Sequence, residues 1–164
     1  MNPELIYTLG TSTRAVDEFI DLLSSHDVEV VVDVRRFPTS RFKHFCREEL
    51  EKLLPEVRIG YVYMGEELGG YRRGGYQNFT TSSQFKAGIS KLEEIAHQKR
   101  VAIMCAERFP WRCHRRFIAL ELAERGWRVS HIIDKATDNV ARCSMRERLP
   151  EAEVSFPPAP RTVH

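Results

Sequence analysis

The sequence lacks any long hydrophobic run, and its N-terminus lacks a basic segment followed by an apolar stretch. The apolar run over residues 28–32 is interrupted by Glu29 and is far shorter than a membrane-spanning helix. We therefore expect neither a membrane anchor nor a secretory leader, and we predict a soluble, cytoplasmic protein with no membrane partner.

Cysteine is also scarce, with four residues in 164 at irregular spacings: Cys46, Cys105, Cys113 and Cys143. A chain of this length buries an adequate core without cross-links, which favours reduced thiols over a disulfide framework. The glycine pairs at 69–70 and 74–75 form neither a G-x-G-x-x-G nor a Walker sequence, so we predict no nucleotide cofactor.

The charge is nearly balanced, with 25 basic and 23 acidic residues and a net charge of +2. This balance gives no general reason to expect nucleic-acid binding. The basic residues are nevertheless grouped in two segments, residues 35–47 and residues 108–116. Placement therefore carries more information here than total charge.

Short apolar runs alternate along the chain with stripes of helical spacing. The runs over 5–9, 28–34, 58–63, 101–105 and 129–133 predict five strands, and the stripes between them predict helices. Pro55 is expected to stop the second helix, and residues 66–76 are expected to form a glycine-rich loop. We predict a single-domain α/β fold over residues 1–148, with an open, mostly parallel five-stranded sheet and helices on both faces in a Rossmann-like or rhodanese-like layering. A proline-rich arm is expected over residues 149–164.

Chemistry is expected where the strands end, because open α/β sheets bind ligands outside the carboxyl ends of their strands. Cys105 ends a predicted buried strand. A following helix and nearby arginines are expected to lower its pKa, which predicts a nucleophile; a buried core thiol is the alternative. Glu107 and His114 are the acid/base candidates, with an ion-pair partner of Arg108 and a surface histidine as the alternatives.

Hydroxyl and guanidinium groups at the same edge are candidates for binding an anion. Arginine matches phosphate or carboxylate with paired hydrogen bonds, although a solvated helix face is the commoner role of any single arginine. The predicted anion-binding residues are Thr11, Ser12, Arg35, Arg36, Arg112 and Arg115.

Several separated motifs give a resemblance to a known family. They are Tyr7-Thr8-Leu9-Gly10-Thr11-Ser12, Val32-Asp33-Val34-Arg35-Arg36-Phe37-Pro38, Glu67-Leu68-Gly69-Gly70, and Met104-Cys105-Ala106-Glu107 followed by Cys113-His114-Arg115. In this order they resemble conserved-domain family 488, a domain of unknown function, over nearly the whole chain to about residue 134. The resemblance implies the fold and the site and carries no activity.

A weaker resemblance connects residues 31–35, 101–105 and 124–127 with the rhodanese layout. It implies that Cys105 is a sulfur-accepting nucleophile in a loop of backbone amides. The loop after Cys105 departs from that layout, because it lacks glycine and contains Glu107 and Pro110.

Together these features predict an enzyme, a thiol-dependent transferase or hydrolase, that acts on a small anionic substrate through Cys105 in an arginine-rich pocket. One alternative is a non-catalytic module that holds nucleic acid or a nucleotide with the same basic edge and the Tyr71–Tyr76 loop. The other alternative is a metal site, built from Cys105, Glu107, Cys113 and His114.

Overall fold

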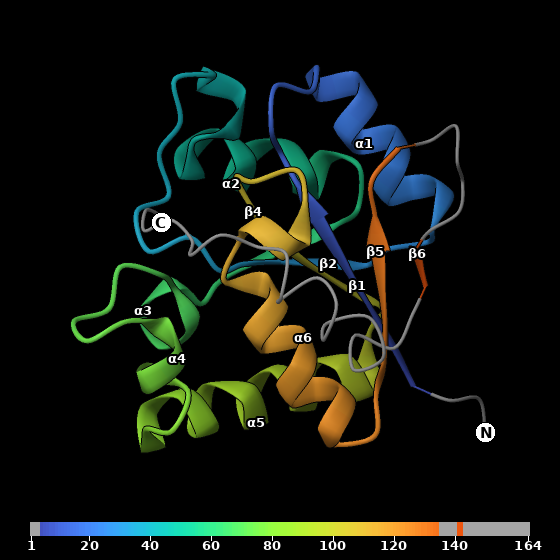
Figure 1. Cartoon of the computed structure of the whole chain (residues 1–164). Helices are drawn as coiled ribbons and strands as arrows, with labels where there is room; N and C mark the ends of the chain where they lie inside the picture. The colour runs from blue at the N-terminus through green and yellow to red at the C-terminus, as the bar shows by residue number, and fades with distance from the viewer. Residues whose placement is uncertain (1–3, 135–140, 143–164) are drawn as a thin grey trace.

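The sheet forms the middle layer of the molecule (Figure 1). The computed structural model describes residues 4–134 and 141–142. Five strands are parallel: β1 (Leu5–Gly10), β2 (Val30–Asp33), β3 (Gly60–Tyr63), β4 (Val101–Cys105) and β5 (Arg128–Ile132). A short strand, β6 (Ala141–Arg142), pairs with β5 in the antiparallel direction, and the order is β3-β2-β4-β1-β5-β6. The predicted mostly parallel α/β sheet is confirmed, while the predicted arm over 149–164 lies outside the described residues.

Helices cover both faces of this sheet. In Figure 1, α1 (Val16–Ser25) and α2 (Arg47–Glu56) lie on one side, and α5 (Ser83–Gln98) and α6 (Arg115–Glu124) lie on the other. Short turns of helix connect them: η1 (Lys43–Phe45), α3 (Gly65–Leu68), α4 (Tyr76–Phe79) and η2 (Pro110–Arg112).

The side chains of each parallel strand contribute to two separate hydrophobic cores, because consecutive side chains point to opposite faces of a sheet. Val31 packs with the side chains of α1 and α2, whereas Val30 and Val32 pack with those of α5 and α6. Strand β4 divides in the same way, with Met104 in the first core and Cys105 in the second. The last residue of β4 therefore lies on the α6 side.

Two local expectations need correction. Helix α2 runs through Pro55 to Glu56. A proline in the last turn removes only one backbone donor, so the helix ends just after it and not before it. The segment over 66–76 is more than a loop, because α3 begins at Gly65 and α4 begins at Tyr76. Ser82 caps α5 by accepting a hydrogen bond from the backbone of Phe85.

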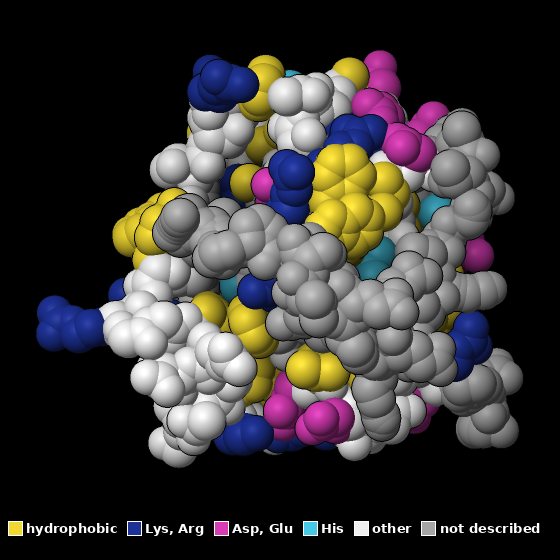
Figure 2. All heavy atoms as spheres, viewed as in Figure 1, with side chains coloured by type: hydrophobic (Ala, Val, Ile, Leu, Met, Phe, Trp, Pro, Cys, Tyr) yellow, Lys and Arg dark blue, Asp and Glu magenta, His cyan; other side chains and the backbone are white. Residues whose placement is uncertain are grey.

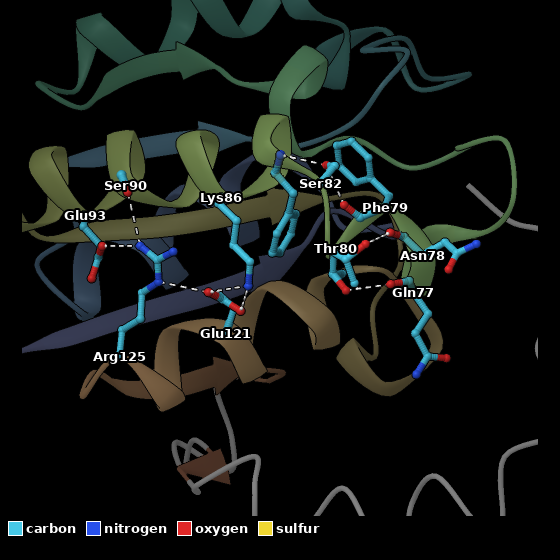
Figure 3. Close-up of polar contacts among 12 residues, drawn as sticks. Gln77, Asn78, Phe79, Thr80, Ser82, Lys86, Ser90, Glu93, Glu121 and Arg125 are labelled. Atoms are coloured by element: carbon cyan, nitrogen blue, oxygen red, sulfur yellow. Dashed lines mark hydrogen bonds and ion pairs between the residues drawn. The ribbon is translucent and has the colours of Figure 1, made fainter.

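A polar network fixes α6 against α5 (Figure 3). Arg125 pairs with Glu93 at 2.8 Å and with Glu121 at 3.0 Å, and Lys86 reaches Glu121 at 3.2 Å. The Nε1 of Trp127 also donates to Glu93. These contacts hold the far end of the helix whose first turn carries the candidate site.

A membrane-crossing helix, long and apolar throughout, does not occur among the residues that the structure describes.

Candidate functional site

A pocket of about 370 Å³ opens beside the carboxyl ends of β2 and β4. The helices that follow these neighbouring strands, α2 and α6, pass to opposite faces of the sheet. Such a switch point leaves a crevice at the strand ends, where open α/β folds bind ligands. The lining residues are Arg35, Arg36, Phe37, Thr39, Tyr71, Cys105, Ala106, Glu107 and His114.

Two thiols lie in contact at this crevice. The Sγ atoms of Cys105 and Cys113 are 2.7 Å apart, and both residues are free cysteines. Cys105 lines the pocket, whereas Cys113 lies behind it just before α6. At this separation one thiol donates a hydrogen bond to the other sulfur, so the ionisation of each cysteine affects that of the other.

A fully buried cation supports the thiol pair. Arg115 has no solvent exposure and donates to Thr8 Oγ1 at 2.9 Å and to the carbonyl oxygens of Glu107 and Arg108. All three acceptors are neutral, and no described carboxylate pairs with Arg115. A buried charge favours a counter-charge nearby, and the two cysteine sulfurs are the groups that raise the pKa of Arg115 against the effect of burial.

The two sulfurs titrate in opposite directions. Burial opposes ionisation of Cys113, but the hydrogen bond from Cys105 and the charge of Arg115 lower the pKa of Cys113 to about 7. Burial, together with the neighbouring Cys113 sulfur, raises the pKa of Cys105 well above its ordinary value. The expected low pKa of Cys105 is therefore wrong: burial dominates, and the first backbone amide of α6, that of Arg115, donates to Cys113 and not to Cys105.

His114 links the thiol pair to the pocket wall. Its Nε2 donates to the carbonyl of Val34 at 2.8 Å, and its Nδ1 lies 3.7 Å from the Sγ of Cys113. Burial lowers the pKa of His114, so the ring is neutral at physiological pH. With the proton held on Nε2, Nδ1 acts as an acceptor facing Cys113.

Arg35 also lines the pocket and is held in place by Asp33. Arg35 donates from Nε and Nη2 to the two oxygens of Asp33, each at 2.8 Å. Tyr61 also donates to Asp33, and the charge of Asp33 raises the pKa of Arg35 against the effect of burial. Asp33 thus compensates much of the charge of Arg35, and Arg36 carries the less compensated charge beside it.

The loop after β1 holds the segment that follows β4 in place. The backbone amides of Thr11 and Ser12 donate to the carbonyls of Cys105 and Ala106, at 2.9 Å and 2.8 Å. Gly10 lies so close to this segment that an added Cβ would overlap the carbonyl of Glu107. These residues hold the β4 loop in place and do not line the pocket.

We expect Gly10→Ala to destabilise the fold by about 1–3 kcal/mol, because the new methyl group has no space beside Glu107. Urea unfolding measures the change. Gly60→Ala is the matched control, since its Cβ would make only ordinary van der Waals contacts, with a Val30 methyl group at 3.6 Å and the Glu29 carbonyl oxygen at 3.8 Å, and we expect a change within about 0.5 kcal/mol. Equal losses in the two variants would contradict the role of Gly10.

The other predicted residues divide into three groups. Glu107 lines the pocket, and its carboxylate accepts from the backbone of Phe109 at 3.2 Å. Arg115 lies beneath the sulfurs as their buried counter-ion, and Arg112 is exposed and outside the pocket lining. Sequence reasoning left Cys113 out of the nucleophilic site, although its proximity to His114 and Arg115 was a visible signal.

The metal alternative has no geometric support. Among the residues that the structure describes, no three His, Cys, Asp or Glu side chains are arranged to hold one ion.

Comparison with known protein families gives a match. Residues 15–122 match the family described as Domain of unknown function DUF488, over more than half of the chain. The chain belongs to this family. The DUF488 match contains every residue that lines the pocket, and it ends earlier than the expected residue 134.

No curated protein and no solved structure matches the chain. The weaker rhodanese-like resemblance therefore stays a prediction from the sequence.

Proposed function

We propose that this DUF488 protein is a thiol-dependent enzyme, a transferase or hydrolase, that acts on a small anionic substrate in the pocket beside Cys105. The observation that carries this proposal is the buried Arg115, which has no described carboxylate partner and lies against a pair of touching thiols. A purely structural core has no need of a buried cation beside two sulfurs, because burying a charge is costly.

The arrangement supports a nucleophilic step. The Cys105 proton passes to the Cys113 thiolate, which leaves Cys105 as the thiolate facing the pocket and Cys113 as a neutral thiol beside Nδ1 of His114. Its sulfur forms a bond to the electrophilic atom of the substrate, and the bond to the leaving group breaks with its electron pair. The leaving group takes up the proton that Cys113 received, relayed through Nδ1 of His114, and the group on Cys105 then passes to water or to a second acceptor.

The negative charge proposed for the substrate follows from the arginines that line the pocket. Arg36 and Arg35 line the same pocket as Cys105, and guanidinium groups favour phosphate or carboxylate ligands. The free thiols of Cys46, Cys105 and Cys113 support placing the protein in the reducing cytoplasm.

The alternative function, a non-catalytic nucleic-acid module, needs a basic surface that follows a phosphate backbone. In Figure 2 the Lys and Arg side chains on the viewed face lie in separate groups among hydrophobic and acidic side chains. A confined pocket with two arginines fits a small anion better than a long polyanion.

Two alkylating reagents test the proposal without knowledge of the substrate. Iodoacetate carries a charge that iodoacetamide lacks, so an arginine-rich pocket attracts only the first reagent. We expect the ratio of iodoacetate to iodoacetamide labelling to be about tenfold higher at Cys105 than at Cys46 in the same sample. Mass spectrometry of the peptides gives both rates.

Arg36→Gln should remove most of this preference, and Arg41→Gln, outside the pocket, should leave it unchanged. Equal reagent ratios at Cys105 and Cys46 would overturn the anionic-substrate proposal, and a Cys105 that reacts only after unfolding would overturn the nucleophile.

A further inference from the structure

Two exposed aromatic rings stand at the rim of the pocket. Among the described residues three large hydrophobic side chains are exposed: Tyr71 at 61%, Phe37 at 60% and Val57 at 38%. Phe37 and Tyr71 both line the pocket, and their ring centroids are 5.3 Å apart with a 51° tilt. Exposed apolar surface that is concentrated beside a pocket marks a ligand contact.

The rings come from distant segments that the backbone brings together. Phe37 follows β2 and Tyr71 follows α3. Gly69 allows this approach, because an added Cβ would overlap the carbonyl of Gly65 and crowd the backbone of Arg36. Arg36 then spans the two segments by donating to the carbonyls of Gly70 and Tyr71, both at 3.5 Å.

Tyr71 is held in an unfavourable backbone conformation. Its φ of 58° lies in the left-handed region, which bulky residues seldom adopt. Arg72 fixes the segment by donating to the carbonyls of Gly69 and Glu66, and its guanidinium lies 3.9 Å from the ring centroid of Phe79. Strain of this kind persists at ligand sites where surrounding contacts enforce it.

A cation lies directly beside the rings. The guanidinium carbon of Arg36 is 5.9 Å from the centroid of Phe37, and Arg35 lines the same pocket. The pocket therefore offers a stacking surface at its rim and positive charge next to it. Its volume of about 370 Å³ falls within the range of small-molecule sites.

We propose that the pocket binds a nucleotide, with the base stacked on Phe37 and Tyr71 and the phosphate beside Arg36. This inference rests on the proposed function and names its substrate class. Aromatic side chains stack on bases of any sequence, and guanidinium groups bind phosphate, so the two features together recognise a nucleobase that carries a phosphate. That chemistry is present in free mononucleotides and in single-stranded nucleic acid.

Calorimetry on the full-length protein tests the proposal, with AMP, GMP, CMP and UMP as one set of probes and short single-stranded DNA and RNA as the other. We expect at least one mononucleotide to bind at least about tenfold more tightly than ribose 5-phosphate, which has the phosphate without the base. Tighter binding of an oligonucleotide, compared at equal salt, would identify nucleic acid as the source of the nucleotide.

Variants of the two aromatic rim residues separate the contribution of stacking to nucleotide binding from the contribution of charge. Phe37→Ala and Tyr71→Asn should each weaken nucleotide binding about tenfold and leave ribose 5-phosphate binding unchanged. Asparagine is chosen because it tolerates the left-handed backbone of residue 71. Val57→Ala is the matched control, because Val57 is exposed but lies outside the pocket lining.

The inference is overturned if no mononucleotide or oligonucleotide binds, or if the rim variants bind nucleotides as tightly as the wild type. Calorimetry does not require a reactive thiol, so its result is independent of the alkylation test. Preferential labelling of Cys105 by iodoacetate without nucleotide binding would leave the proposed function standing and overturn only this substrate class.

Discussion

Replacing Cys113 with alanine should slow alkylation of Cys105 at pH 7 by about tenfold or more. The cysteine pair shares one proton, and the pKa of Cys113 is about 7, so the pair holds a thiolate in about half of the molecules at that pH. Without Cys113 the lone buried thiol must ionise by itself, and a thiol with an ordinary pKa is only a few per cent ionised at pH 7.

The dependence of Cys105 labelling on pH shows the direction in which the loss of Cys113 shifts the pKa. In the wild type, labelling of Cys105 by iodoacetamide should rise with a midpoint near pH 7, and in Cys113→Ala the midpoint should move upward. Cys113→Ser preserves the shape of the side chain but cannot ionise in this range, so it should show the same shift. Cys46→Ala is the control without effect, and an unchanged profile in both Cys113 variants would contradict the shared thiolate.

The positions of the strand ends were predictable from the sequence because continuous apolar runs and helical stripes have different periods. Once the parallel sheet was inferred, chain connectivity alone placed the segments after β2 and β4 at one edge. That is why Arg35, Arg36, Cys105, Glu107 and His114 were candidates before any coordinates, and all of them line one pocket.

The electrostatics of the thiols were not predictable in the same way. They depend on where α6 begins and on which side Arg115 packs, and both are set by tertiary contacts with Thr8 and the β4 loop. Because α6 begins at Arg115, its first backbone amide donates to Cys113 and not to Cys105. The exposure of Phe37 and Tyr71 likewise follows from loop packing, since sequence patterns do not reveal which apolar residues remain at the surface.

Mild oxidation should convert the thiol pair into an intramolecular disulfide and abolish labelling at both cysteines. Diamide takes up the two hydrogen atoms that Cys105 and Cys113 lose together, and the two sulfurs need no large movement because they already touch. Peptide mass spectrometry without reductant should find the 105–113 cross-link, and dithiothreitol should restore labelling of Cys105.

This oxidation separates a shared-thiolate pair from two inert core thiols. A pair that holds a thiolate at pH 7 reacts with the oxidant at that pH, whereas core thiols react only after the protein unfolds. Cys113→Ala should leave Cys105 without its partner, so diamide would no longer produce the intramolecular link, while Cys46→Ala should form it as the wild type does. A native protein that retains full labelling of Cys105 after diamide would show that the sulfurs do not act as one unit, and the nucleophilic role of the pair would fail with it.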